Sequence, residues 1–280
     1  MTSLQFSVIL KSARSIFYSL FFGGSAMPEN IVRIRAVVRR LIQKRRRGQS
    51  FLELALIIPV LLIMLLGVVE VAFFLGRYLD LLDLTREAAR FASVRDPFTV
   101  QVNKNLWNCG PAPAGTEIPF DFYYQTSCVF SPPAGSALCT NPKFCNGLNS
   151  FIKMNPATDD IVISVFTITN ALVTDVWPAP NGYWAFSDHD ADTAHNENWK
   201  RDCQGNDVRT EPYFNEGRVV SSLSTAASTL NKGFVGIEFY YCYEQALGLA
   251  SFIPNPLRAH VYTLMPLPAA QPSPTPKTSP

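Results

Sequence analysis

An uncharged apolar run near the N-terminus is the feature that most restricts how this chain can fold. Leu54–Val69 holds sixteen consecutive residues without a charge. Extended from Phe51 to Gly76, the run exceeds the roughly 20 mostly apolar residues that a membrane-spanning helix needs. Glu53 and Glu70 lie near its two ends. The sequence therefore predicts a single helix that anchors the chain in a lipid bilayer.

The charges are unevenly distributed on the two sides of this run. The first fifty residues contain ten Lys or Arg and one acid, a formal charge of +9, and the remaining residues contain fourteen Lys or Arg and twenty-one acids, a formal charge of −7. Basic residues gather at the cytoplasmic end of a spanning helix, so we expect the N-terminus inside the cell and everything after Gly76 outside. The stretch VRRLIQKRRR would also suit nucleic acid, but its position against an apolar span favours topology, and we expect no nucleic-acid partner.

Glu53 lies five residues after Gly48, behind three arginines. A carboxylate inside a spanning segment is costly and usually has a partner. Cleavage after Gly48 would free an α-amine at Gln49, about one helical turn from Glu53. The two opposite charges would then neutralise each other in a medium of low dielectric, within one chain or between neighbours. The alternative is a glutamate that reaches the membrane surface and has no further role.

The same residues carry a family resemblance. The segment RRRGQSFLELALIIPVLL, followed by Glu70 and by the run REAAR at Arg86–Arg90, resembles the TadE-like pseudopilins of the tight-adherence (Tad, type IVc) pilus system. The resemblance extends from Arg45 to Val94. The chain differs from the family at Leu54, which follows the glutamate at a position that is commonly aromatic, and its leader is long.

This resemblance implies several roles and partners. A prepilin peptidase would cut between Gly48 and Gln49, and Glu53, then the fifth residue of the mature chain, would be the carboxylate that assembly requires. Other pilins or pseudopilins and an inner-membrane Tad platform would be the protein partners. Residues 51–75 would pack helix against helix in a filament.

Residues 1–48 form the basic leader that this interpretation requires. Within it, residues 1–26 are apolar but interrupted by Lys11 and Arg14, which makes a membrane span there a poor prediction. A short interfacial helix or a signal peptide are alternatives for that stretch. Translation from Met27 instead of Met1 would leave a compact, basic leader.

The helix is expected to continue beyond the membrane. Leu75 and Leu79 recur at helical spacing, and LTREAARFASV is rich in helix formers. Pro97 then disfavours helix in the residue before it. We therefore expect one transmembrane and extended helix over residues 49–95, with a hinge near Gly76 as the alternative.

Residues 96–265 are expected to form an extracytoplasmic domain that contains every cysteine of the chain. An even number of cysteines in an oxidising compartment predicts disulfides, and fifteen pairings of six cysteines remain open. Zinc is the alternative, although no CxxC spacing occurs. The disulfide candidates are Cys109, Cys128, Cys139, Cys145, Cys203 and Cys242.

Three segments of this domain have the alternating, β-branched or aromatic pattern of strands, namely residues 160–170, 234–243 and 258–264. Residues 219–230 favour a short helix, and the proline-rich tail at residues 266–280 is expected to be disordered. The predicted fold class is α+β. A long N-terminal transmembrane helix leads into a small extracytoplasmic domain with an antiparallel sheet packed on the helix and disulfide-stapled loops.

The domain shows little sign of catalysis or metal binding. Asp188, Asp190 and Asp192 alternate, but an EF-hand needs glycine at the sixth place and glutamate at the twelfth, where this chain has Thr193 and Trp199. A solvated acidic loop is the better prediction, with another kind of calcium loop as the alternative. Because no GxSxG, HExxH or glycine-rich phosphate loop occurs, we expect no enzyme, no metal and no cofactor.

The expected function is structural. We expect a TadE-like minor pilin or pseudopilin, a membrane-anchored subunit of a Tad-type pilus or secretion apparatus in the bacterial cytoplasmic membrane. Its partners would be the lipid bilayer, the prepilin peptidase, other pilins and the Tad platform. The first alternative is an uncleaved single-pass membrane protein with an extracytoplasmic binding domain, and the second is an anchored extracytoplasmic enzyme.

Overall fold

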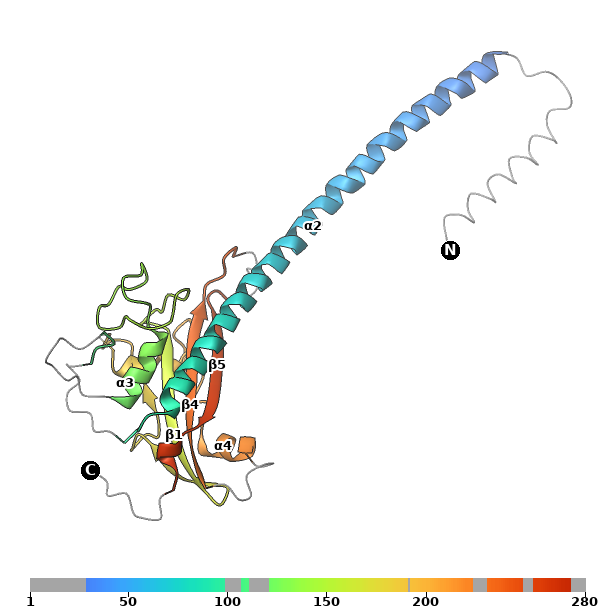
Figure 1. Cartoon of the computed structure of the whole chain (residues 1–280). Helices are drawn as coiled ribbons and strands as arrows, with labels where there is room; N and C mark the ends of the chain where they lie inside the picture. The colour runs from blue at the N-terminus through green and yellow to red at the C-terminus, as the bar shows by residue number, and fades with distance from the viewer. Residues whose placement is uncertain are drawn as a thin grey trace. The chain divides into compact units, whose positions relative to one another are not determined.

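A single long helix, α2, dominates the N-terminal part of the chain (Figure 1). The computed structural model describes residues 29–98, 107–110, 121–190, 192–223, 231–248 and 254–272, with side chains from Phe51 onward. α2 spans Glu29–Ser93. It therefore begins well before the expected residue 49, and it continues through Gly76 without the alternative hinge. The uncertain stretch at residues 1–26 lies outside the described residues.

The chain divides into two units, residues 1–65 and residues 66–280. In the first unit, α2 exposes its apolar side chains, with Phe51 exposed by 73% and Ile63 by 66%. Within the described residues, one helical stretch, Phe51–Ser93, is long and apolar enough to cross a membrane by length and composition. This stretch is the one in which the sequence predicts a membrane anchor.

The second unit is built on a five-stranded antiparallel sheet with the order β2-β1-β4-β5, in which β3 also pairs with β1. β1, β4 and β5 confirm the three strands predicted from the sequence, whereas β2 and β3 were not predicted. The strands are β1 (Asp160–Thr169), β2 (Leu172–Trp177), β3 (Trp184–Ala185), β4 (Lys232–Tyr243) and β5 (Leu257–Pro266).

The remaining helical elements are short. They are α3 (Phe122–Ser127), α4 (Glu216–Leu223) and the 3₁₀ turns η2 (Cys128–Phe130), η3 (Phe186–Asp188), η4 (Asn198–Lys200) and η5 (Pro268–Ala270). The side chain of Asp121 caps α3 by accepting a hydrogen bond from the backbone N–H of Tyr123 at 3.0 Å. α4 confirms the first part of the short helix expected at residues 219–230 but begins at Glu216, and residues 224–230 lie outside the described residues.

The C-terminal part of α2 packs on one face of the sheet, as predicted (Figure 1). Its buried residues recur every three or four positions, so they form one stripe along the helix. They are Leu81, Leu84, Ala88, Ala89 and Ala92, and they share a core with sheet residues such as Ile161, Ile237 and Phe239. The end of α2 thus belongs to the core of the sheet domain.

The opposite face of the sheet is covered by the polar segment between β2 and β4. Trp199 packs there against Tyr240, and Phe214 packs against Phe166. A Cβ atom on Gly236 would lie 2.7 Å from Cδ2 of Phe214, so only glycine allows this ring to approach β4 so closely. The segment therefore completes the second half of the core.

All six cysteines form disulfides, so zinc does not bind them. The structure also gives the pairing that the sequence left open. Two disulfides staple the loops around α3, and the third joins the segment after η4 to the end of β4. The pairs are Cys109–Cys128, Cys139–Cys145 and Cys203–Cys242. Together with the helix and the antiparallel sheet, they confirm the predicted α+β fold.

The chain after β5 differs from the expected disordered tail. The backbone N–H of Leu267 donates to the carbonyl oxygen of Gly233 at 2.8 Å, and Leu267 and Ala270 are fully buried. This packing requires Gly233, because a Cβ atom there would lie 2.3 Å from the carbonyl oxygen of Leu267. Residues 267–272 are therefore part of the fold, and residues 273–280 lie outside the described residues.

Candidate functional site

The residues that the sequence assigns to processing lie on α2. Gly48 and Gln49 are part of its helical backbone. The side chain of Glu53 is exposed and forms no hydrogen bond or ion pair with any side chain described from residue 51 onward. The cleavage position and the assembly role of Glu53 stay predictions.

The second glutamate of the apolar run, Glu70, is held by three donors from the end of β4 and the turn that follows. One carboxylate oxygen, Oε1, accepts hydrogen bonds from the hydroxyl of Tyr243 at 3.0 Å and from the N–H of Ala246 at 2.9 Å. The other, Oε2, accepts from the N–H of Leu247 at 2.8 Å. The carboxylate thus connects α2 to residues more than 170 positions later in the chain.

Neighbouring side chains fix this contact. Tyr243 is buried at the last position of β4, where it pairs with Leu257 of β5. The ring of Phe74, one helical turn after Glu70, meets the ring of Tyr243 edge to face with their centroids 5.4 Å apart. Such an arrangement of two rings is favourable beyond the area they bury. The hydroxyl of Tyr243 is therefore positioned by both the strand and the helix.

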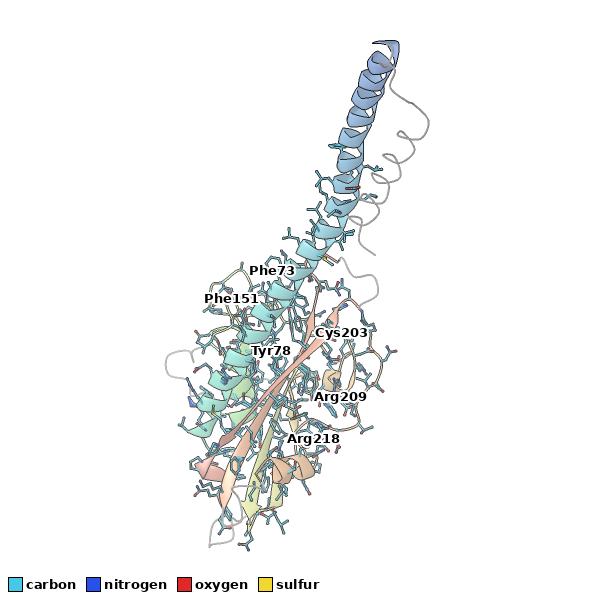
Figure 2. All side chains as sticks on the ribbon, turned by 90° about the vertical axis from the view of Figure 1, so that its right-hand side faces the viewer. Phe73, Tyr78, Phe151, Cys203, Arg209 and Arg218 are labelled. Carbon is cyan, nitrogen blue, oxygen red and sulfur yellow. A yellow bond between two sulfur atoms is a disulfide. The ribbon has the colours of Figure 1, made fainter. Side chains whose placement is uncertain are left out.

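A further contact lies on the same part of α2. Nη1 of Arg77 donates to the carbonyl oxygen of Phe151 at 2.7 Å, which places Phe151 beside the helix (Figure 2). The same guanidinium lies 3.8 Å from the carboxylate of Asp80. Glu70 and Arg77 therefore join two separate loops of the domain to α2, each through groups of the loop backbone.

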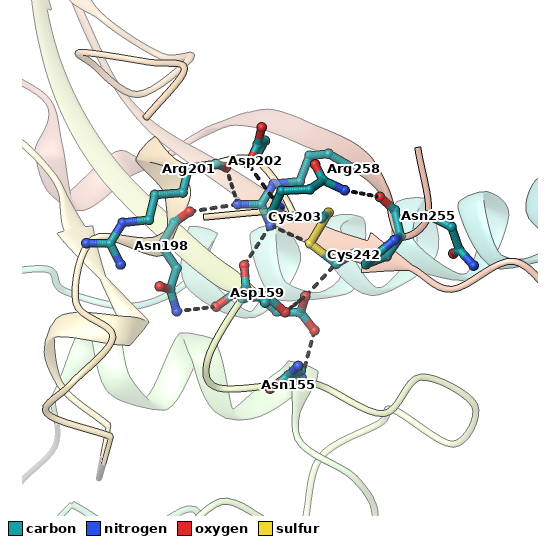
Figure 3. Close-up of a disulfide and its surroundings, with 12 residues drawn as sticks. Asn155, Asp159, Asn198, Arg201, Asp202, Cys203, Cys242, Asn255 and Arg258 are labelled. Atoms are coloured by element: carbon teal, nitrogen blue, oxygen red, sulfur yellow. Dashed lines mark hydrogen bonds between the residues drawn. A yellow bond between two sulfur atoms is a disulfide. The ribbon is translucent and has the colours of Figure 1, made fainter. Parts of the chain in front are cut away.

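The third disulfide lies within a network of buried polar groups (Figure 3). Asp159 accepts hydrogen bonds from the N–H of Cys242 at 2.9 Å and from the N–H of Asn155 at 2.7 Å. The two terminal nitrogens of Arg258 donate to three backbone carbonyl oxygens at 2.6–2.7 Å, those of Thr158, Asn198 and Arg201. The network fastens the disulfide segment to β1, β4 and β5.

Asp160, the first residue of β1, is fully buried and accepts from four donors. They are the N–H groups of Ile161, Ser187 and Trp199 and the hydroxyl of Ser187, at 2.8–3.0 Å. Burial raises the pKa of Asp160 to about 7, although these hydrogen bonds act in the opposite direction. Burial likewise raises the pKa of Asp159 to about 6. Both carboxylates act as structural acceptors for the loops that cover the sheet.

Glu238 on β4 is a second buried acceptor. It takes hydrogen bonds from the N–H groups of Tyr213 and Phe214, each at 2.9 Å, from the hydroxyl of Tyr240 and from Nε2 of His260 at 3.2 Å. The rings of Tyr240 and His260 stack with their centroids 4.3 Å apart. Because its oxygens are engaged by the fold, Glu238 fastens the segment before α4 to the sheet.

The acidic loop does not gather its carboxylates around one point. Asp192 pairs with Nδ1 of His195 at 2.8 Å, and this hydrogen bond lowers the pKa of Asp192. Asp190 accepts from the N–H of Asp192 at 2.8 Å. Among the described residues, no three His, Cys, Asp or Glu side chains are placed to hold a metal ion. A cavity of about 450 Å³ adjoins the loop, lined in part by Phe144, Phe186 and Asp190.

The comparison with known families bears on the helix that carries Glu53 and Glu70. Residues 48–90 match the family model of TadE-like proteins. This segment is TadE-like. The resemblance expected from the sequence is thereby confirmed for 43 of the 280 residues. No curated protein and no solved structure matches the chain.

The TadE-like segment includes the helical face that packs on the sheet. In its REAAR run, Ala88 and Ala89 are fully buried, whereas Arg90 is exposed and forms an ion pair at 2.7 Å with the half-buried Glu87. The small residues let the helix approach the strands, and the charged residues face away. The run therefore has a packing role in this chain.

The sequence pattern of the TadE-like segment includes Glu70 but does not indicate its partners. Tyr243 is buried at the end of β4 and also donates to Glu70 through its hydroxyl. A carboxylate within an apolar run signals that some partner exists. Nothing in the local sequence indicates that the partner is the turn after β4.

Proposed function

We propose that this protein is a minor pilin or pseudopilin of a Tad-type pilus or secretion apparatus. Residues 51–76 anchor it in the bacterial cytoplasmic membrane, with residues 1–48 as a basic leader inside the cell and the α+β domain outside. The TadE-like match at residues 48–90 is the observation that carries this proposal. The prepilin peptidase, other pilins and the Tad platform are its protein partners.

The way in which the domain is attached supports a structural role. A filament subunit transmits load between its helix and its outer domain, so the two need firm connections. α2 continues from the apolar stretch into the core of the domain, and Glu70 and Arg77 bind separate loops of that domain. The three disulfides further fix loops that cover the sheet.

The charge distribution supports the proposed orientation. The first fifty residues carry a formal charge of +9, directly before the apolar run. Such an excess favours retention of that end in the cytoplasm. A reporter enzyme that is active only outside the cytoplasm should therefore be active when it is fused after Pro280.

Deletion of the gene in a cell that assembles a Tad-type pilus tests the function. We expect surface pili to be lost and to return with the wild-type gene or with Gly76→Ala, because a Cβ atom at Gly76 meets nothing within 4 Å. Gly48→Leu should fail to restore them, because a large side chain crowds the cleavage position. Unchanged piliation in the deletion strain would contradict a role in assembly.

A second outcome would favour the rival function. If pili are unchanged and the protein remains in the membrane at its full length, it acts as an uncleaved anchored module with an outer binding domain. The cavity of about 450 Å³ beside the acidic loop would then be the first place to search for a ligand.

A further inference from the structure

Glu70 lies directly after the uncharged stretch Leu54–Val69, toward the outer end of the apolar run Phe51–Gly76. A helix rises 1.5 Å per residue and the hydrocarbon core is about 30 Å thick, so about 20 residues cross it. Counted from Phe51, these residues end at Glu70. Glu70 is also the first charged residue after the uncharged stretch Leu54–Val69. The residue count and the position of this first charge both place Glu70 at the boundary between hydrocarbon and headgroups.

The turn after β4 is bonded to this same residue. We call residues Glu244–Gly248 the β4 turn. The N–H groups of Ala246 and Leu247 donate to the Glu70 carboxylate at 2.9 and 2.8 Å. Hydrogen bonds of this length leave no room for displacement along the membrane normal, so the β4 turn has the same depth as Glu70.

The polar groups of the β4 turn suit such a depth. Backbone N–H groups near the hydrocarbon must be paired within the protein, because water is scarce there. Ala246 and Leu247 pair with Glu70, and the N–H of Gln245 donates to Oδ1 of Asn255 at 3.0 Å. Each of these three consecutive N–H groups therefore has a protein acceptor.

Apolar side chains remain exposed around these pairs. Leu247 is 40% exposed on the β4 turn, and on α2 Val71 and Phe73 are 57% and 54% exposed. The β4 turn contains no Lys or Arg. Attraction to anionic headgroups is thus not what would hold it, whereas burial of Leu247 among acyl chains would be favourable.

We infer that the β4 turn is a lipid-contact site, which lies on the outer leaflet of the bilayer and inserts Leu247 at the level where headgroups meet acyl chains. Glu70 is the positioning residue that holds it there. This inference rests on the proposed function in one respect, since it requires α2 to span the membrane. It adds a second membrane contact, formed by the folded domain itself.

Tryptophan quenching by brominated phosphatidylcholine tests the inference on the full chain in vesicles. Leu247→Trp adds a reporter to the β4 turn, and Leu172→Trp is the matched control, because Leu172 is 64% exposed at the start of β2. Leu172 lies beside the end of β1 that pairs with Lys232, at the opposite end of β4 from Tyr243. The twelve residues of β4 separate the two ends by about 40 Å.

We expect bromine near the headgroup end of the acyl chains to remove more than half of the fluorescence that Leu247→Trp adds over the wild type. Bromine near the chain ends should remove less, and the fluorescence added by Leu172→Trp should be unaffected. Adding Glu70→Ala to Leu247→Trp should reduce the quenching, whereas adding Glu87→Ala, which removes a half-buried carboxylate further along α2, should not. Replacing a third of the lipid with phosphatidylglycerol should leave the quenching unchanged.

Vesicle flotation and labelling of free thiols separate the failures. If the variants float with the vesicles, have no free thiols and still show no quenching at Leu247→Trp, the lipid contact is wrong and the anchor stands. If the wild type does not float, the spanning helix and the lipid contact are both wrong. Should Leu247→Trp alone show free thiols, Ala246→Trp, at an exposed position of the same turn, takes its place with the same expected quenching, and its absence overturns the lipid contact.

Discussion

The carboxylate of Glu70 accepts a hydrogen bond from the backbone N–H of Leu247, 177 residues later in the chain, at 2.8 Å. Two further donors, the hydroxyl of Tyr243 and the N–H of Ala246, share the same carboxylate. A glutamate of the TadE-like segment thus lies directly after the uncharged stretch and binds the sheet domain. Anchor and domain are connected at this residue by a contact that the sequence does not reveal.

Glu70→Ala should loosen the β4 turn without unfolding the domain. The amides of Ala246 and Leu247 lose their acceptor, so their hydrogen exchange should accelerate by about tenfold. Amides in the middle of β4, such as that of Ile237, should exchange as in the wild type. Exchange measured by mass spectrometry on detergent-solubilised protein checks this, and unchanged protection at the β4 turn would count against the contact.

The disulfides should differ in their contributions to stability. In the chain-entropy account, a cross-link over 39 residues, Cys203–Cys242, stabilises by about 4 kcal/mol, and one over 6 residues, Cys139–Cys145, by about 2 kcal/mol. Replacing both cysteines of each pair by serine should reproduce this order in the free energy of unfolding by denaturant. The wild type should show no thiol that reacts with a labelling reagent after denaturation without reductant. Equal losses for the two pairs would contradict the entropic explanation.

The buried carboxylate of Asp160 should make stability depend on pH. Its pKa rises from 3.8 to about 7 on folding, so the folded state holds a proton that the unfolded state has lost between these values. Its contribution to stability is present below pH 4 and is lost as the pH rises to about 7. In thermal melts across this range, Asp160→Asn should weaken the decline. Asp175→Asn, on the exposed side of β2, is the control and should leave it unchanged.

Replacing Glu53 should affect assembly and leave processing intact. If an α-amine at Gln49 pairs with Glu53 in the assembled filament, Glu53→Gln keeps the size of the side chain and removes its charge, which leaves the amine unpaired in an apolar layer. We expect a protein that inserts and is cut after Gly48 but does not enter pili. Normal pili built from the cleaved Gln variant would show that no such pair is needed.

The strands show how far local sequence determines this fold. β1 was predicted because Asp160–Thr169 is β-branched and alternating. β2 was missed because the turn before it, Asn170 and Ala171, has positive φ at both residues, 50° and 65°, but lacks the glycine that normally signals such a turn. The hairpin forms because the pairing of β2 with β1 compensates for an unfavourable alanine.

The candidate site shows where prediction from sequence stops. A partner was predicted for Glu53 and none for Glu70, whose donors lie 173–177 residues away and include two backbone N–H groups that carry no sequence signal. The cysteine count indicated disulfides, whereas their pairing depends on which loops meet in space. Local patterns therefore predicted α2, α4 and three of the five strands, and contacts between distant segments determined how these elements are joined.

Mass spectrometry of the N-terminus tests most directly whether this chain is processed after Gly48 as a TadE-like subunit. The protein would be extracted from membranes of cells that express a prepilin peptidase, with the Gly48→Leu variant and peptidase-free cells as controls. We predict a mature N-terminus at Gln49 in the wild type and a retained leader in both controls. A wild-type protein that keeps residues before Gln49 in the presence of the peptidase would contradict cleavage after Gly48.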